Sequence, residues 1–368
     1  MEPLVISDYG AYLGKHSERV VVRYRDKERA NDEYALMDLE QVIIGSRGVS
    51  LSSDLVEACT QRGIEISFLG FNGQPYAKLL SPALTATVIS RREQLAAYQD
   101  ERGFEIAKRF VQGKLQNQIR LVRYFGKYRK KRAPKQYAEL TERVRKIQDL
   151  LKELDALKAA DAGLCPIDAM RSTLLNLEGR AGALYWECVG RLLPGGKFGK
   201  REHRGARGEV NVLLNYGYGI LYSQIWSALS LAGLEPFAGF LHVDRPGKPS
   251  LVLDFIEEFR QTVVDRVVFA MINKRFKVEW EAPDSDAARD AHQSAKPGGD
   301  AEETQREQRR LSKDTRRAFA DRVLARLQET EGFESKQQKL ASIIQQQARH
   351  LAMFLRRERD YKPFVARW

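Results

Sequence analysis

Cysteine is scarce in this chain, and long apolar runs are absent. The 368 residues include three widely spaced cysteines, Cys59, Cys165 and Cys188, and no CxxC pair. Such a set argues against a disulfide framework and a thiolate zinc site, and it is typical of a reducing compartment. No run approaches the ~18 apolar residues of a membrane helix, and the N-terminus lacks the basic and apolar regions of a signal peptide. We therefore expect a cytoplasmic protein that does not span a membrane.

Acidic residues are outnumbered as well. Lys and Arg number 61 against 49 Asp and Glu, which gives a net charge of +12. Much of the excess is local, since the segment 108–135 contains eleven basic residues and no acidic one. A cluster of this kind favours a polyanionic partner, because neutralised phosphates release condensed counterions. A solvated helix face is the alternative interpretation.

Two patterns of hydrophobic periodicity divide the chain. Short runs rich in Val, Ile and aromatic residues, with a short helix at 52–62, predict strands at 4–6, 19–25, 39–44 and 64–70. From about residue 85 the period is helical, over 85–125, 136–160, 168–193, 209–233, 250–275, 313–328 and 336–357. We predict an α+β protein with a small N-terminal β domain at 1–84 and a large all-helical domain at 85–368. Residues 283–308 lack an apolar period and predict a mobile loop.

A glutamate interrupts the apolar stripe of the helix predicted at 168–193. Glu178 follows Leu174 by four residues and precedes Tyr185 by seven. A carboxylate on a buried face is costly unless a metal ion or an arginine compensates it. A metal site and an ion pair with Arg171 or Arg180 explain this position equally well.

A histidine and an acidic group follow. His242 ends an apolar run before a loop broken by prolines, where functional side chains are common, although a single histidine is more often structural. Asp254 lies three residues before Glu257 and four before Glu258, so the three carboxylates share one helical face. A divalent cation such as Mn²⁺ or Mg²⁺ relieves the repulsion between them, whereas a solvated acidic face needs no ion. The spacing leaves the choice between Glu257 and Glu258 open.

A basic, glycine-rich segment separates these candidates. Residues 197–207 contain five basic residues and one acidic residue, which suits contact with a DNA backbone. The tyrosines at 216, 218 and 222 have helical spacing, which favours packing over stacking on bases. The candidate DNA contacts are the cations nearest to the candidate ligands in sequence: Lys200, Arg201, Arg204, Arg207 and Lys248.

Three sequence blocks carry a specific resemblance to a known family. They read NLEGRAGALYWE at 176–187, NVLLNYGYGILY at 211–222 and GLEPFAGFLHVDRPGKPSLVLDFIEEFR at 233–260. In this order they resemble the CRISPR-associated endonuclease/integrase of spacer acquisition, the universal CRISPR adaptation nuclease. The segments GAYLGKHSERVVV near the N-terminus and DYKPFVARW at the C-terminus extend the resemblance over nearly the whole chain.

The resemblance implies both a fold and a ligand set. It implies an N-terminal β domain that serves dimerisation, followed by a helical catalytic domain. The metal ligands, which are also the catalytic residues, are then Glu178, His242 and Glu257, bound to Mn²⁺ or Mg²⁺, with Asp254 as a further candidate ligand. The family pattern thus chooses Glu257 over Glu258.

The activity implied is metal-dependent DNA integration and cleavage in CRISPR adaptation, a form of antiviral defence. The 3′-hydroxyl of a captured DNA fragment attacks a phosphodiester at the edge of a CRISPR repeat. The implied partners are the prespacer and repeat duplexes, a second copy of the chain in a homodimer, and a small ferredoxin-like CRISPR-associated protein that completes a hetero-hexamer.

Two other functions remain open on the sequence. A tyrosine recombinase would use Tyr216, Tyr218 or Tyr222 and would need no metal ligands. A non-catalytic nucleic-acid scaffold would explain the basic run at 108–135, but it would leave Glu178 without a purpose.

Overall fold

The computed structural model describes residues 2–70, 73, 75–79, 88–159, 165–202, 206–281 and 310–367. The chain divides into two compact units, each assembled from separate stretches. The first comprises Met1–Ala83, Glu202–Ser223 and Phe276–Leu324, and the second comprises Leu84–Arg201, Gln224–Arg275 and Ala325–Trp368. The first stretch ends near the boundary predicted at residue 84, and two later segments join the same unit. The loop predicted at 283–308 lies outside the described residues.

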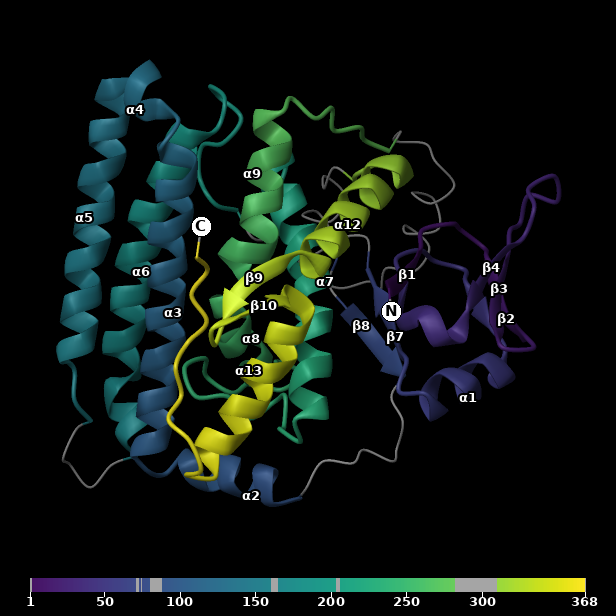
Figure 1. Cartoon of the computed structure of the whole chain (residues 1–368), viewed down its shortest axis with the longest axis horizontal. Coiled ribbons are helices and arrows are strands. Elements are labelled where there is room, and N and C mark those ends of the chain that lie inside the picture. The colour runs from purple at the N-terminus through teal and green to yellow at the C-terminus, as the bar shows by residue number, and fades with distance from the viewer. Residues whose placement is uncertain are drawn as a thin grey trace, which may run out of the picture. The chain divides into compact units, whose positions relative to one another are not determined.

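The N-terminal stretch of the first unit is built from strands (Figure 1). In its described residues, β1 (Glu2–Ile6), β5 (Leu39–Ile44), β7 (Glu65–Leu69) and β8 (Pro75–Leu79) form one sheet in that order, and β1, β5 and β7 run parallel. A second sheet has the order β4 (Asp32–Ala35), β3 (Arg19–Arg23), β2 (Tyr12–His16) and β6 (Ser50–Leu51). A short 3₁₀ turn, η1 (Leu36–Asp38), leads from β4 into β5. The strands predicted from the sequence correspond to β1, β3, β5 and β7.

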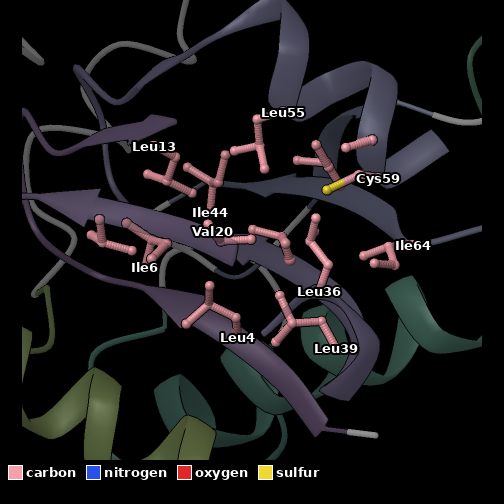
Figure 2. Packing of buried hydrophobic residues seen from close by; sticks show 14 of the residues in the cluster. Leu4, Ile6, Leu13, Val20, Leu36, Leu39, Ile44, Leu55, Cys59 and Ile64 are labelled. Carbon is pink, nitrogen blue, oxygen red and sulfur yellow. The ribbon is translucent and has the colours of Figure 1, made fainter. Parts of the chain in front are cut away.

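A single hydrophobic core joins these sheets to α1 (Ser53–Gln61). Figure 2 shows side chains from both sheets and the helix meeting in one cluster, among them Leu13, Ile44 and Leu55. The hydroxyl of Ser52 caps α1 by accepting a hydrogen bond from the backbone N–H of Leu55 at 3.3 Å. Strand β2 was not predicted, because its sequence, YLGKH, contains a glycine and has few of the β-branched residues that mark a strand. α7 (Glu209–Leu231) and α12 (Lys313–Gln328) contribute helical segments to this unit.

The second unit is mainly helical. Its elements are α2 (Val88–Ala97), α3 (Glu101–Gly126), α4 (Arg129–Arg132), α5 (Pro134–Ala156), α6 (Pro166–Leu192), α8 (Ser250–Phe255), α9 (Arg266–Asn273) and α13 (Leu340–Leu355). The long helices α3, α5 and α6 pack side by side (Figure 1). α5 and α6 both begin with proline, whose fixed φ and missing N–H suit the first helical position. The α+β class with a large helical part is confirmed.

Three predicted helices differ from the structure. The helix expected at 85–125 is divided into α2 and α3, and the side chain of Asp100 caps the start of α3. The helix expected at 250–275 is broken into α8, a 3₁₀ turn η2 (Ile256–Glu258), a π-helical segment η3 (Gln261–Asp265) and α9. The helix expected at 336–357 begins at Leu340, because β10 (Lys336–Lys339) pairs with β9 (Thr330–Phe333) in a hairpin. Glu334 and Ser335, the two turn residues, have positive φ angles of 45° and 65°, as a two-residue hairpin turn requires. Neither is a glycine or asparagine, so the sequence carries no turn signal there.

Candidate metal centre

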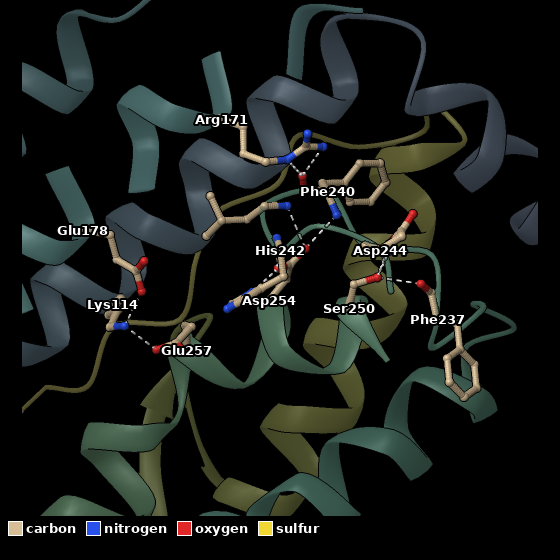
Figure 3. Close-up of polar contacts among 12 residues, drawn as sticks. Lys114, Arg171, Glu178, Phe237, Phe240, His242, Asp244, Ser250, Asp254 and Glu257 are labelled. Atoms are coloured by element: carbon tan, nitrogen blue, oxygen red, sulfur yellow. Dashed lines mark hydrogen bonds and ion pairs between the residues drawn. The ribbon is translucent and has the colours of Figure 1, made fainter. Parts of the chain in front are cut away.

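Two predicted ligands face each other across a lysine. Glu178 lies on α6 and Glu257 on η2, while Lys114 reaches between them from α3 (Figure 3). The Nζ atom of Lys114 forms an ion pair with Glu178 and lies 2.8 Å from Oε2 of Glu257. The compensating partner of Glu178 is therefore this lysine. Arg171 and Arg180, the partners considered from the sequence, pair with Asp168 and Glu153 instead.

The electrostatics keep Glu257 ionised. Its side chain is 3% exposed, and such burial on its own would raise the pKa of the carboxyl. The positive charges of Arg260, 2.7 Å from Oε1, and of Lys114 outweigh burial and lower this pKa to about 2. Oε2 is buried and forms an ion pair with the Nζ atom of Lys114 at 2.8 Å. This oxygen therefore already faces a cation, which is Lys114.

His242 is oriented by Asp254. Its Nδ1 lies 2.6 Å from Oδ1 of Asp254, and its backbone N–H donates to the same oxygen at 2.9 Å. The backbone N–H groups of Phe240 and Leu241 donate to Oδ2. With these four contacts, the fully buried Asp254 holds the end of the GFLH segment and favours a proton on Nδ1 of His242. Nε2 is then left with a lone pair, which is the arrangement typical of a metal-bound histidine.

The loop that carries His242 sits closely against α8. The N–H of Gly239 donates to Oγ of Ser250 at 2.8 Å, and a Cβ atom at Gly239 would lie 2.6 Å from the carbonyl carbon of Ser250. From the other side, the guanidinium of Arg171 on α6 donates to the carbonyl oxygen of Phe240 at 3.1 Å and 3.2 Å. The loop is therefore fixed between α6, which carries Glu178, and α8, which leads to Glu257 (Figure 3).

The C-terminal strap, residues 360–367, anchors the turn that carries Glu257. Glu258 is fully buried and accepts hydrogen bonds from the Tyr361 hydroxyl at 2.6 Å, the Phe364 N–H at 2.8 Å and the Gln347 amide at 3.2 Å. Burial raises the pKa of Glu258 to about 8, although these donors oppose the rise. Glu258 therefore serves to hold η2 and the strap together, a role that the helical spacing did not reveal.

Asn117 on α3 ties the same elements together. Its amide nitrogen donates to the carbonyl oxygens of Glu258 and Phe364 at 2.9 Å and 2.8 Å, and its Oδ1 accepts from the N–H of Ala366 at 3.0 Å. A Cβ atom at Gly113 would lie 2.8 Å from Pro363, so the helix surface must be bare where the strap crosses it. The sequence analysis missed Asn117. Its signal is a polar residue near Leu115 and Ile119, and the structure shows that its side chain is fully buried.

The candidate ligands are of the types that divalent cations prefer, and Lys114 lies between two of them. Within the described ranges, no group of three or more His, Cys, Asp or Glu side chains is gathered closely enough to hold a metal ion. Lys114 supplies the positive charge between Glu178 and Glu257 instead. Chemically, two carboxylates and an imidazole with a lone pair on Nε2 suit Mn²⁺ or Mg²⁺.

The basic run at 108–135 serves more than one purpose. Lys108 is buried, and its Nζ donates to the carbonyl oxygens of Asp155 and Leu157 at 2.9 Å and 2.7 Å, so it is structural. Lys114 belongs to the candidate metal centre. Arg120 and Arg123 on α3 are exposed, and so are five cations from the end of α3 through α4 to the start of α5, namely Lys127, Lys130, Lys131, Arg132 and Lys135. These exposed cations remain available to a polyanion.

The other candidate DNA contacts are scattered. Lys200 and Arg207 are exposed, Lys248 is half-buried, and the Arg201 guanidinium lies 5.7 Å from the ring centre of Trp186. Arg204 lies outside the described residues.

The tyrosines considered for a recombinase are packed. Tyr216 is 2% exposed, and its ring lies 6.2 Å from that of Phe319. Burial raises the pKa of Tyr216 and of Tyr222, which opposes the ionisation a nucleophile needs. These positions agree with the packing interpretation.

Two observations concern the cysteines and the expected absence of a membrane span. All three cysteines, which the structure describes, are free thiols. Among the described helices, none combines the length and the apolar character needed to cross a membrane.

Comparison with known proteins places these features in a family. Residues 4–281 match the family described as CRISPR associated protein Cas1. A CRISPR-associated endonuclease Cas1 of Archaeoglobus fulgidus is 35% identical over 372 residues, which cover 99% of each chain.

Solved structures share the fold. A casposase bound to an integration product has a TM-score of 0.76 at 21% identity, covering 99% of this chain and 93% of the casposase. A chain of a Cas6-RT-Cas1–Cas2 complex has a TM-score of 0.72 at 22% identity, covering 99% of this chain and 36% of that chain. With a sequence match over residues 4–281 and a relative aligned along the full length, this chain belongs to the Cas1 family of CRISPR-associated proteins.

Proposed function

We propose that this chain is a metal-dependent DNA endonuclease and integrase that inserts short foreign DNA fragments into a CRISPR repeat array. The observation that carries the proposal is the facing pair Glu178 and Glu257, with Lys114 between them and Arg260 beside Glu257. The endonuclease name of the Archaeoglobus relative and the integration product bound to the casposase support the reaction class.

The proposed metal ligands are Glu178, Glu257 and Nε2 of His242, with Mn²⁺ or Mg²⁺ as the ion. When bound, the ion polarises a phosphoryl oxygen and offsets charge on the leaving oxygen. We assign Asp254 to positioning, because four donors already occupy its two oxygens. Its task is to fix the ring plane and the protonated nitrogen of His242.

The remaining charged side chains act on the DNA. Arg260, beside Glu257, and Lys114, once displaced from the carboxylates, add positive charge where a phosphodiester gains negative charge in the transition state. The nucleophile is the 3′-hydroxyl of the captured fragment, so no covalent protein intermediate forms, and water in its place gives hydrolysis. The chain contributes mainly orientation and electrostatic stabilisation.

The assembly is part of the proposal. We propose that the N-terminal β domain serves homodimerisation and that a small ferredoxin-like CRISPR-associated protein completes a hetero-hexamer. The similar chain in a Cas6-RT-Cas1–Cas2 complex supports the presence of a CRISPR-associated partner. The proposed DNA contacts include Lys200, Arg201, Arg207 and Lys248. Free thiols at all three cysteines suit the expected cytoplasmic location.

A half-site integration assay tests the function. A labelled DNA fragment with a free 3′-hydroxyl is incubated with a repeat-containing duplex, with and without the small partner protein, in Mn²⁺, Mg²⁺ or EDTA. We expect transfer in Mn²⁺ that Glu178→Gln abolishes and that the matched variant Glu187→Gln, at an exposed carboxylate on the same helix, leaves unchanged.

The outcomes separate the candidate functions. Transfer that survives in Glu178→Gln would disprove the metal-centre assignment. Loss of transfer in Tyr218→Phe, with Glu178→Gln still active, would instead favour a tyrosine recombinase. If the unaltered chain binds DNA but never transfers a strand, the non-catalytic scaffold is the function that still agrees with the data.

A further inference from the structure

A large basic cavity lies in the second unit, apart from the candidate metal centre. It has a volume of about 920 Å³, and α3, α5, the β9–β10 turn, α13 and the C-terminal strap form its walls. In Figure 1 the strap runs along α3, which agrees with the hydrogen bonds of Asn117 to Phe364 and Ala366. This volume is at the upper end of the range of about 300–1,000 Å³ for ligand sites.

The cavity faces away from the metal centre. Its α3 wall includes Arg120 and Arg123, which follow Lys114 by six and nine residues. At about 100° per residue, they point about 120° and 180° around the helix from Lys114. Since Lys114 points to Glu178 and Glu257, Arg120 and Arg123 line the cavity from the other side of α3.

The charge of the cavity suits a polyanion. Six basic side chains line it, namely Arg120, Arg123, Lys152, Arg359, Lys362 and Arg367, against three acidic ones. One of the acids, Glu334, is already paired with Arg359. Arg120, Arg123, Lys362 and Arg367 are exposed, and none of them forms an ion pair with another described residue. Unpaired cations around one hollow attract phosphates more strongly than the same charges spread over a convex surface.

The cavity also contains a stacked aromatic pair. The rings of Phe333 and His350 lie 5.9 Å apart with an interplanar angle of 23°. Both side chains line the cavity, and both are partly exposed. Burial and the charge of Arg359 lower the pKa of His350, which favours the uncharged ring. A flat aromatic surface among cations is how proteins bind single-stranded nucleic acid, with phosphates at the cations and bases stacked on the rings.

We propose that this cavity is a second nucleic-acid site, which holds a few nucleotides of single-stranded DNA or RNA on the side of α3 opposite the metal centre. The inference rests on the proposed function to the extent that the chain handles nucleic acid. A single strand fits a hollow of this size, whereas a duplex would lie across its mouth and leave the aromatic pair unused. Bases that stack there need no sequence preference.

Binding without chemistry tests the site. The full chain in EDTA is titrated with a fluorescein-labelled oligothymidylate, an oligouridylate of equal length and a blunt duplex, and anisotropy is followed at several salt concentrations. Arg120→Gln/Arg123→Gln is compared with Arg145→Gln/Lys146→Gln, an equal loss of charge at exposed positions on α5 that do not line the cavity.

The slope of log K against log salt is negative. We expect the first double variant to reduce its magnitude by about 1.4 for the single strands, because two phosphate contacts are lost at about 0.7 each. The control should keep its slope. Phe333→Leu, which preserves apolar volume, should weaken single-strand binding about tenfold at unchanged slope, as expected for one lost stacking contact. DNA and RNA arms show which strand is preferred, and binding of either one supports the site.

Three results would overturn the proposal. These are equal slopes in the two double variants, unchanged affinity in Phe333→Leu, or photocrosslinks from a 5-iodouracil oligonucleotide that avoid the peptides of α3, β9 and the strap. An acidic peptide that binds the cavity where both oligonucleotides fail would reassign it to a protein partner and likewise refute the nucleic-acid site. Because Glu178→Gln should abolish strand transfer yet keep this binding, failure of the proposed function is distinguished from failure of the second site.

Discussion

Replacing Lys114 with methionine tests how the candidate metal centre is balanced. The side chain of Lys114 is 14% exposed and is the cation between Glu178 and Glu257. Methionine keeps most of the volume and removes the charge. The two carboxylates then repel each other, and Glu257 retains only Arg260 among its described ion-pair partners.

The expected cost follows from burial. Removing one partner of a buried ion pair destabilises a protein by about 3–5 kcal/mol. Because Glu178 and Lys114 are partly exposed and Arg260 still compensates Glu257, we expect about 1–3 kcal/mol. For a unit of this size, that lowers the Tm in EDTA by about 3–10 °C.

The same change should strengthen metal binding. A divalent ion at the two carboxylates no longer competes with an ammonium group, whose repulsion with a doubly charged ion at about 4 Å reaches about 8 kcal/mol at a dielectric constant of about 20. Since a lysine can withdraw from the ion, we expect a smaller gain, about tenfold in the Kd for Mn²⁺. Saturating Mn²⁺ should therefore raise the Tm of Lys114→Met more than that of the unaltered chain.

Thermal melts in EDTA and in Mn²⁺, together with calorimetric titration of Mn²⁺, measure both effects. The matched control is Lys146→Met, at a lysine on α5 that is exposed and pairs with Glu142. An equal Mn²⁺-induced shift of Tm in the unaltered chain and in Lys114→Met would refute the reasoning, since Lys114 would then not occupy the position of the metal.

Three further predictions concern the surroundings of the site. Asn117→Ala should lower the unfolding free energy by about 2–4 kcal/mol in denaturant melts, because it orphans two carbonyls and one N–H that are buried; an unchanged midpoint would show that the strap does not need this anchor. Gly239→Ala should reduce strand transfer at least about tenfold with a near-native circular dichroism spectrum, since the new Cβ displaces the His242 loop from Ser250; full activity would mean that this loop is free to move. At pH 8, iodoacetamide should label Cys165 first, because burial raises the pKa of Cys59 to about 11 and of Cys188 to about 12 and keeps both as unreactive thiols below those values; labelling at equal rates, followed by mass spectrometry, would contradict this.

The sequence alone was sufficient for the class of fold and for most elements. Strict helical periods predicted α6 and α7 nearly to their ends, because an amphipathic stripe repeats over many turns, but they did not reveal the break between α2 and α3. The same logic failed at 250–275, where the period continues but the backbone changes to a 3₁₀ turn and a π-helical segment at Glu257. Hydrophobic period reports which face is buried and does not report a local change in hydrogen-bond register.

The candidate ligands show the same division. Spacing placed Asp254, Glu257 and Glu258 on one face, and the family resemblance separated Glu257 from Glu258. The structure adds the physical reason, since Glu258 accepts two hydrogen bonds from the strap and one from Gln347 on α13, while Glu257 faces Lys114 and Glu178. The assignment of Glu178, His242 and Glu257 to a metal remains a prediction.

The composition and the hydrophobic period predicted a basic α+β chain with carboxylates on buried helical faces. These properties depend only on the residues within each segment. Tertiary structure decided which partners those carboxylates meet. Lys114, Asn117 and the strap are 64, 141 and about 100 residues from the groups they contact, and no local pattern encodes such a distance. The basic run at 108–135, read from the sequence as one feature, was likewise divided by packing into a structural lysine, a lysine of the candidate metal centre and a surface on the far side of α3.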